Sequence, residues 1–152
     1  MVAVIQRVGF AKVEVEGIYV AQIGAGLLVL LGISIEDEMA QADFLVSKIS
    51  QLRIFSDLEG KMNKSVLDLD LEILVVSQFT LLADASQGNR PSYLKAARPE
   101  KAIPLYAYFC DSIEKRIGKK IGKGVFGADM KVELLNDGPV TIVLDTDIIM
   151  KK

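Results

Sequence analysis

The chain has 152 residues, of which 51% are hydrophobic and 25% charged, and its formal net charge is -2. This length and composition fit one globular domain spanning residues 1–152, and they exclude a disordered, collagen-like or disulfide-rich chain. The charge balance excludes an all-round basic surface, so any contact with nucleic acid is expected to be local.

Histidine is absent, and Cys110 is the single cysteine. These counts exclude a Ser-His-Asp triad, a histidine-ligated metal site, an internal disulfide and a multi-cysteine zinc site. The carboxylates are scattered along the chain, so nothing points to a Mg²⁺ site either, and we expect no metal and no cofactor. No apolar stretch approaches the roughly 20 residues that span a bilayer, and the first residues do not resemble a secretion leader. We expect a cytoplasmic protein without a membrane partner.

The first third of the chain reads as β-structure. The apolar run from Val2 to Val8 predicts a short strand buried on both faces. Alternation begins at Lys12, and Glu16-Gly17 then predicts a turn into a second strand, IYVAQI, which completes a hairpin. The run LLVLLG predicts another buried strand from residue 27 to 32.

Two helices are expected. In the first, Asp37 is the expected N-cap, and the apolar stripe consists of Ala42, Leu45, Ile49 and Leu52. The second is expected over Pro99 to Ile117, with both of its prolines in or near the first turn and Gly118 as the stop.

The remaining segments add strands and loops. Strands are expected around residues 53–55, 71–76, 130–134 and 140–144, a polar loop over 83–92, and an irregular glycine-rich segment over 119–129. The fold class is therefore α+β.

Ser77-Gln78-Phe79-Thr80 follows the expected strand at 71–76. Unpaired N–H groups at a strand end are able to stabilise a developing oxyanion. The alternative is that the two hydroxyls close the strand by local hydrogen bonds. Thr80 as a nucleophile needs an activating base, and the chain has no histidine to supply one.

Asn136-Asp137-Gly138-Pro139 lies between two expected strands. The pattern favours a hairpin turn, because Asp-Gly is a common turn pair. The alternative is a cis Gly138-Pro139 bond, a form found in about 5–6% of X-Pro bonds.

One dense basic cluster lies at the end of the second helix, formed by Lys115, Arg116, Lys119, Lys120 and Lys123. Compensation of the helix dipole and contact with a phosphate backbone both account for it. In the adjoining Gly124-Val125-Phe126-Gly127, Phe126 is either a stacking platform for a base or part of the core.

Together these motifs resemble the bacterial-type D-aminoacyl-tRNA deacylase family over nearly the whole chain. The resemblance rests on AVIQRV, GLLVLLGI, KMNKSV, LVVSQFTL, RPS, GVFGADM and NDGPVT. SQFT followed by the Gly-Pro of NDGPVT is the specific combination.

The resemblance implies a hydrolase that cleaves the ester between a D-amino acid and the 3′-terminal adenosine of tRNA, and that also removes glycine from mischarged tRNA. It implies a largely antiparallel, barrel-like homodimer in which a cis Gly138-Pro139 pair from one subunit enters the pocket of the other and excludes L-amino acids. Its partners are tRNA and a second copy, with no DNA.

The resemblance also assigns site residues. Ser77, Gln78, Phe79 and Thr80 line the catalytic pocket, and Phe126, Gly127 and Met130 bind the substrate with Gly138 and Pro139. The basic cluster is expected to contact tRNA. Because Thr80 lacks a base, attack by water assisted by the tRNA 2′-hydroxyl is favoured over a threonine nucleophile. The alternatives are a non-catalytic RNA-binding dimer and a hydrolase of other small esters or amides.

Overall fold

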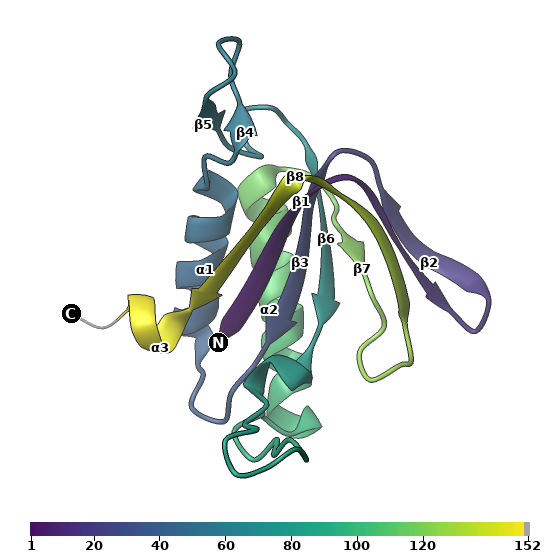
Figure 1. Ribbon diagram of the computed structural model, residues 1–152, viewed down its shortest axis with the longest axis vertical. Coiled ribbons are helices and arrows are strands. Elements are labelled where there is room, and N and C mark those ends of the chain that lie inside the picture. Colours follow the sequence, from purple (N-terminus) through teal and green to yellow (C-terminus); the bar gives the residue numbers. More distant parts are fainter. Residues whose placement is uncertain (151–152) are drawn as a thin grey trace.

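In the computed structural model, which describes residues 1–150, a six-stranded mixed sheet curls until it is nearly closed (Figure 1). Its strands are β1 (Val2–Val15), β2 (Ile18–Ile23), β3 (Gly26–Gly32), β6 (Glu72–Ser77), β7 (Gly122–Lys123) and β8 (Lys131–Asp145). The strand order is β2-β1-β3-β6-β7. The last strand, β8, lies outside this order and pairs with β1. The pairs that involve β1 are antiparallel, whereas β6 is parallel to both β3 and β7. The α+β prediction is confirmed, and the sheet is mixed.

Two apolar cores lie on opposite faces of this sheet. The first lies between the sheet and two long helices, α1 (Met39–Gln51) and α2 (Pro99–Ile117). The second fills the inside of the curl and includes Val8, Ile23 and Leu74. Figure 1 shows both helices beside the same strands, and the short hairpin of β4 (Phe55–Ser56) and β5 (Met62–Lys64) projecting from one end.

The N-terminal strand is longer than expected. The structure has one 14-residue strand in place of the short segment Val2 to Val8, and its burial alternates. The prediction of burial on both faces is wrong here because the helices cover the face of Ala3 and Ile5, while Val4 pairs with the 63% exposed Val143. The hairpin into β2 and the buried strand β3 are confirmed.

The helix predictions hold except for one cap and for the position of one proline. The second helix spans Pro99–Ile117 and ends at Gly118 in the left-handed conformation, as expected. Its second proline, Pro104, lies beyond the first turn. Asp37 is not the N-cap of α1, since Glu38 occupies that position in a capping box. Asp37 is instead buried, and it accepts a hydrogen bond from the Met1 α-amino group at 2.6 Å.

The hairpin predicted at Asn136 to Pro139 is wrong, because β8 continues through it. Both halves of β8 pair with β1, with Asn136 opposite Val8 and Thr141 opposite Gln6, so the intervening residues form a bulge opposite Arg7. Arg7 holds the bulge by donating to the Asp137 carbonyl at 2.9 Å. The Gly138-Pro139 bond within it is cis.

The shorter segments differ from expectation by a few residues. The strand expected at 53–55 is β4, which begins at Phe55. The strand expected at 71–76 is β6, one residue later at each end, and it leads into a 3-10 helix, η1 (Phe79–Leu82). The glycine-rich segment contains the two-residue strand β7. After β8, a short helix, α3 (Thr146–Ile149), ends the described chain.

Candidate functional site

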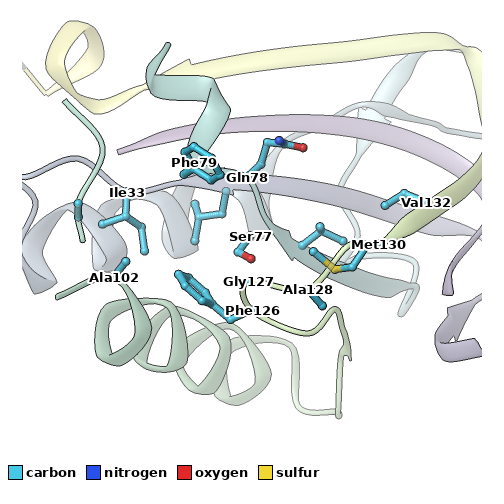
Figure 2. Close-up of a pocket in the computed structure, with 13 residues that line it drawn as sticks. Ile33, Ser77, Gln78, Phe79, Ala102, Phe126, Gly127, Ala128, Met130 and Val132 are labelled. Atoms are coloured by element: carbon cyan, nitrogen blue, oxygen red, sulfur yellow. The ribbon is translucent and has the colours of Figure 1, made fainter. Parts of the chain in front are cut away.

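A cavity of about 250 Å³ opens where β3 and β6 end (Figure 2). Phe79 lies on one side of it and Phe126 on the other, with Ser77 between them. None of the lining residues carries a charge. They are Leu31, Ile33, Val76, Ser77, Gln78, Phe79, Ala97, Ala102, Phe126, Gly127, Ala128, Met130 and Val132.

One wall is built where β6 stops. The apolar run of β6 is buried up to Val76, and Ser77 is its last residue. The Gln78 amide donates to the Leu31 carbonyl at 2.8 Å, and the chain then turns into η1. The first amides of a helix have no acceptor within it. Phe79 and Thr80 are the first residues of η1, and in the part of the chain that the structure describes their amides donate no hydrogen bond.

The opposite wall is attached to β6 by a short parallel pairing. The Val75 carbonyl accepts from the Gly124 amide at 3.0 Å and from the Tyr106 hydroxyl at 3.1 Å. A side chain at Gly124 would place its Cβ 2.7 Å from the Met130 sulfur, so the Met130 side chain would have to shift to admit one. The ring of Phe126 packs against that of Tyr106, with centroids 5.8 Å apart.

Burial sets the protonation of the polar groups behind this wall. Burial raises the pKa of the Tyr106 hydroxyl well above its usual value, and burial also raises the pKa of the Cys110 thiol to about 11. Both groups are therefore neutral at physiological pH. They contribute a hydrogen bond and packing to the wall, and neither supplies a base to the cavity.

Thr80 is exposed and is not among the residues that line the cavity. Its hydroxyl oxygen accepts a hydrogen bond from the Gln78 side-chain amide. An amide N–H is a donor that cannot take a proton from a hydroxyl at neutral pH. Among residues 1–150, the Thr80 hydroxyl therefore has no hydrogen-bond partner that could act as its base.

The structure brings most of the predicted site residues together. Ser77, Gln78, Phe79, Phe126, Gly127 and Met130 line this one cavity, whereas Thr80, Gly138 and Pro139 do not. Gly138 and Pro139 lie exposed on the β8 bulge. A Cβ at Gly138 would lie 3.0 Å from a guanidinium nitrogen of Arg7, the side chain that supports the bulge. Glycine at this position therefore leaves room for the Arg7 side chain.

Three members of the basic cluster contact polar groups of the chain itself. Arg116 donates to the Ser50 hydroxyl, Lys119 forms an ion pair with Asp70, and Lys120 lies 3.7 Å from Glu114. Neither Lys115 nor Lys123 forms an ion pair with any residue from 1 to 150. Contact with tRNA remains a prediction for all five.

Sequence reasoning missed the apolar lining. Ala97, Ala102 and Ala128 leave the space that the cavity occupies, and Tyr106 supports its wall. No sequence signal separates these from core residues, because an apolar residue beside a cavity follows the same helical or strand periodicity as one in the core.

Residues 1–150 contain neither a cluster of metal ligands nor a membrane-spanning helix. No three acidic or cysteine side chains converge as metal ligands would. No helix there combines the length and the apolar character needed to span a membrane.

Comparisons with known proteins connect this geometry to a family. The family model described as D-Tyr-tRNA(Tyr) deacylase matches residues 4–145. A D-aminoacyl-tRNA deacylase of Bacteroides thetaiotaomicron is 57% identical over 143 residues, covering 94% of this chain and 95% of the relative. One from Flavobacterium johnsoniae is 58% identical, covering 96% and 97%.

Two solved structures share the fold. A structure titled c-Myc DNA Unwinding Element Binding Protein has a TM-score of 0.89 at 46% identity and covers 95% of this chain and 98% of its own. A structure titled as a probable eukaryotic D-amino acid tRNA deacylase has a TM-score of 0.80 at 17% identity, covering 94% and 97%. The latter bears on the fold alone.

Proposed function

This chain belongs to the D-Tyr-tRNA(Tyr) deacylase family, and we propose on that basis that it hydrolyses the ester bond of D-aminoacyl-tRNA. Water adds to the ester carbonyl carbon, the bond to the ribose 3′-oxygen breaks, and free D-amino acid and tRNA are released. The same reaction on glycyl-tRNA removes mischarged glycine.

The observation that carries this proposal is an uncharged cavity lined by Phe79, whose amide, like that of the next residue, Thr80, has no acceptor in the described part of the chain. In the tetrahedral intermediate, negative charge develops on the former carbonyl oxygen, and backbone N–H groups at Phe79 and Thr80 are suited to stabilise it. Removal of one such donor typically reduces kcat about 10²- to 10³-fold. Electrostatic stabilisation of this kind requires no histidine.

The attacking water needs a proton acceptor, and the lining residues include no carboxylate or amine. We assign a relay to the ribose 2′-hydroxyl of the substrate, adjacent to the ester: its oxygen accepts the proton of the attacking water while its own proton passes to the departing 3′-oxygen. Thr80→Ala is then expected to retain most of the deacylation rate, because Thr80 contributes its backbone N–H and not its hydroxyl. Complete loss of activity in a variant that still folds and binds tRNA would contradict this assignment.

Selection for D-amino acids is assigned to a second copy of the chain. The lining of the cavity has no carboxylate for the substrate α-ammonium group, which leaves neutral acceptors such as the Ser77 hydroxyl and backbone carbonyls to bind it. Gly138 and Pro139 are exposed, do not line the cavity of their own chain, and are supported by Arg7. We assign to this pair from a partner subunit the carbonyls that bind the α-ammonium and exclude L-substrates.

Subunit mixing tests the shared site. Pro139→Ala and Phe126→Ala damage the two halves of each site in different chains. A mixed dimer has one site made of an intact cavity and an intact Gly138-Pro139, so refolding the two variants together should restore D-selective activity. Failure of restoration in verified mixed dimers would place both halves in the same chain.

The decisive test of the proposed function compares deacylation of D-Tyr-tRNA and L-Tyr-tRNA under matched conditions. Hydrolysis of the D-form alone supports it. Binding of both without cleavage would favour the alternative of a non-catalytic RNA-binding dimer, and rapid cleavage of free aminoacyl esters would favour a general esterase.

A further inference from the structure

Two exposed aromatic side chains stand side by side at the cavity. Phe79 is 56% exposed and Tyr93 is 40% exposed, and their rings meet edge to face with centroids 5.1 Å apart. Exposed apolar residues that occur singly are ordinary, but a contacting aromatic pair beside a cavity is a feature of binding surfaces. Phe79 also lines the cavity, so the aromatic surface continues outward from it.

Both rings belong to segments that are hydrogen-bonded to β3 or to the residue that follows it. Phe79 follows Gln78, whose amide is bonded to the Leu31 carbonyl at 2.8 Å. Tyr93 lies between a bridge that pairs Ser92 with Asp84 and the Ala97 amide, which donates to the Ile33 carbonyl at 2.9 Å. The pair is therefore held in place, and its exposure is not the result of a loose loop.

We propose that the Phe79–Tyr93 pair is a stacking platform for the single-stranded nucleotides that precede the terminal adenosine of the bound RNA. This proposal rests on the proposed function and extends it beyond the cavity. The cavity of about 250 Å³ accepts the aminoacyl end, and the preceding base needs a surface outside it. Aromatic faces bind any base in this way, which suits an enzyme that acts on many tRNAs.

The charges nearby suit an RNA strand. Arg90, Lys95 and Arg98 lie in the same connecting segment as Tyr93, and all three are exposed. Arg98 has only a 3.9 Å contact with the exposed Glu100, and in the described part of the chain Arg90 and Lys95 form no ion pair. The one carboxylate in this loop, Asp84, accepts from the Ser86 amide. Phosphates of the strand would meet Arg90 and Lys95 here, neither of which forms an ion pair within residues 1–150.

The test uses two probes, the short RNA 5′-ACCA-3′ and adenosine 5′-monophosphate, with binding measured by calorimetry or NMR. Tyr93→Leu should weaken binding of the RNA by about 5- to 150-fold, the usual range for loss of one stacked base. It should leave binding of the mononucleotide unchanged, and Tyr93→Phe should restore RNA binding. Tyr19→Leu is the matched control, because Tyr19 is 54% exposed on β2 and is not in this segment.

The outcomes separate this platform from the proposed function. Tighter binding of the RNA than of the mononucleotide, lost in Tyr93→Leu, supports the platform even if no ester is cleaved. Equal affinity of the wild-type protein for both probes would overturn it, as would equal weakening of both by Tyr93→Leu. A change of oligomeric state in Tyr93→Leu would overturn it too, because the pair would then be an interface between copies of the chain.

Discussion

Tyr106 is expected to position one wall of the cavity without touching the substrate. Its hydroxyl donates to the Val75 carbonyl at 3.1 Å, and its ring packs against Phe126. Tyr106→Phe removes the hydrogen bond and keeps the ring, whereas Tyr106→Leu removes both. The two variants therefore separate anchoring of the helix to β6 from support of the Phe126 wall.

The magnitudes follow from these contacts. A buried hydrogen bond between neutral groups contributes about 0.5–1.5 kcal/mol net. The Val75 carbonyl keeps the Gly124 amide as a donor, so Tyr106→Phe leaves no unsatisfied acceptor and should lower the free energy of unfolding by about 1 kcal/mol. Tyr106→Leu also loses the aromatic contact and creates a cavity, for a total of about 3 kcal/mol.

The assay combines denaturant unfolding with steady-state deacylation of D-Tyr-tRNA. Tyr106→Leu should raise KM more than it lowers kcat, because Phe126 loses its support while the amides at Phe79 stay in place. Tyr108→Phe is the control. Its hydroxyl is on the same helix and donates to Asp43 at 2.6 Å, and Tyr108 does not line the cavity. An unchanged KM in a folded, destabilised Tyr106→Leu would refute the positioning role.

Three further predictions concern stability and reactivity. Gly26→Ala places a Cβ 1.8 Å from the Glu72 carbonyl oxygen, so it should force β3 from β6 and destabilise by about 3 kcal/mol or more; wild-type stability in urea would contradict this. Asp37→Asn removes the buried charged partner of the Met1 ammonium group and should lower the free energy of unfolding by about 3–5 kcal/mol. An unchanged unfolding midpoint would show that this ion pair does not stabilise the fold. Burial raises the pKa of the Cys110 thiol from 9.0 to about 11, so this thiol should react with thiol reagents at pH 8 only after unfolding. Its contribution to the free energy of unfolding should decline as the pH rises from 9 to 11. Rapid labelling of the native protein would be inconsistent with burial of the thiol.

Local sequence rules predicted the elements whose determinants lie close together in the chain. The second helix was placed correctly because proline favours a first helical turn and a left-handed glycine ends a helix, at Pro99 and Gly118. The predicted cap at Asp37 failed for the opposite reason, since its partner Met1 is 36 residues away. The two-residue strand β7 exists only because β6 is beside it, so no local pattern marks it.

The bulge in β8 shows the same limit at a proposed site. Asp-Gly followed by proline is typical of a turn, and nothing nearby contradicts a hairpin. The strand continues because both of its halves find partners along the much longer β1, and because Arg7 bonds to the Asp137 carbonyl. A strand of 14 residues that pairs along its length outweighs the preference of a short turn sequence.

The position of the cavity follows from the parallel part of the sheet. Pairing of β3 with β6 ends at Leu31 and Ser77, and the chain leaves both strands on the same side, so a hollow forms beyond their ends. A residue next to this edge must be small: a Cβ at Gly32 would lie 2.6 Å from the Leu82 side chain and 2.9 Å from the Gln78 carbonyl. Glycine there allows η1 to pack against the end of β3. That packing fixes where Phe79 and its amide stand, so a core glycine determines the geometry on which the proposed chemistry depends.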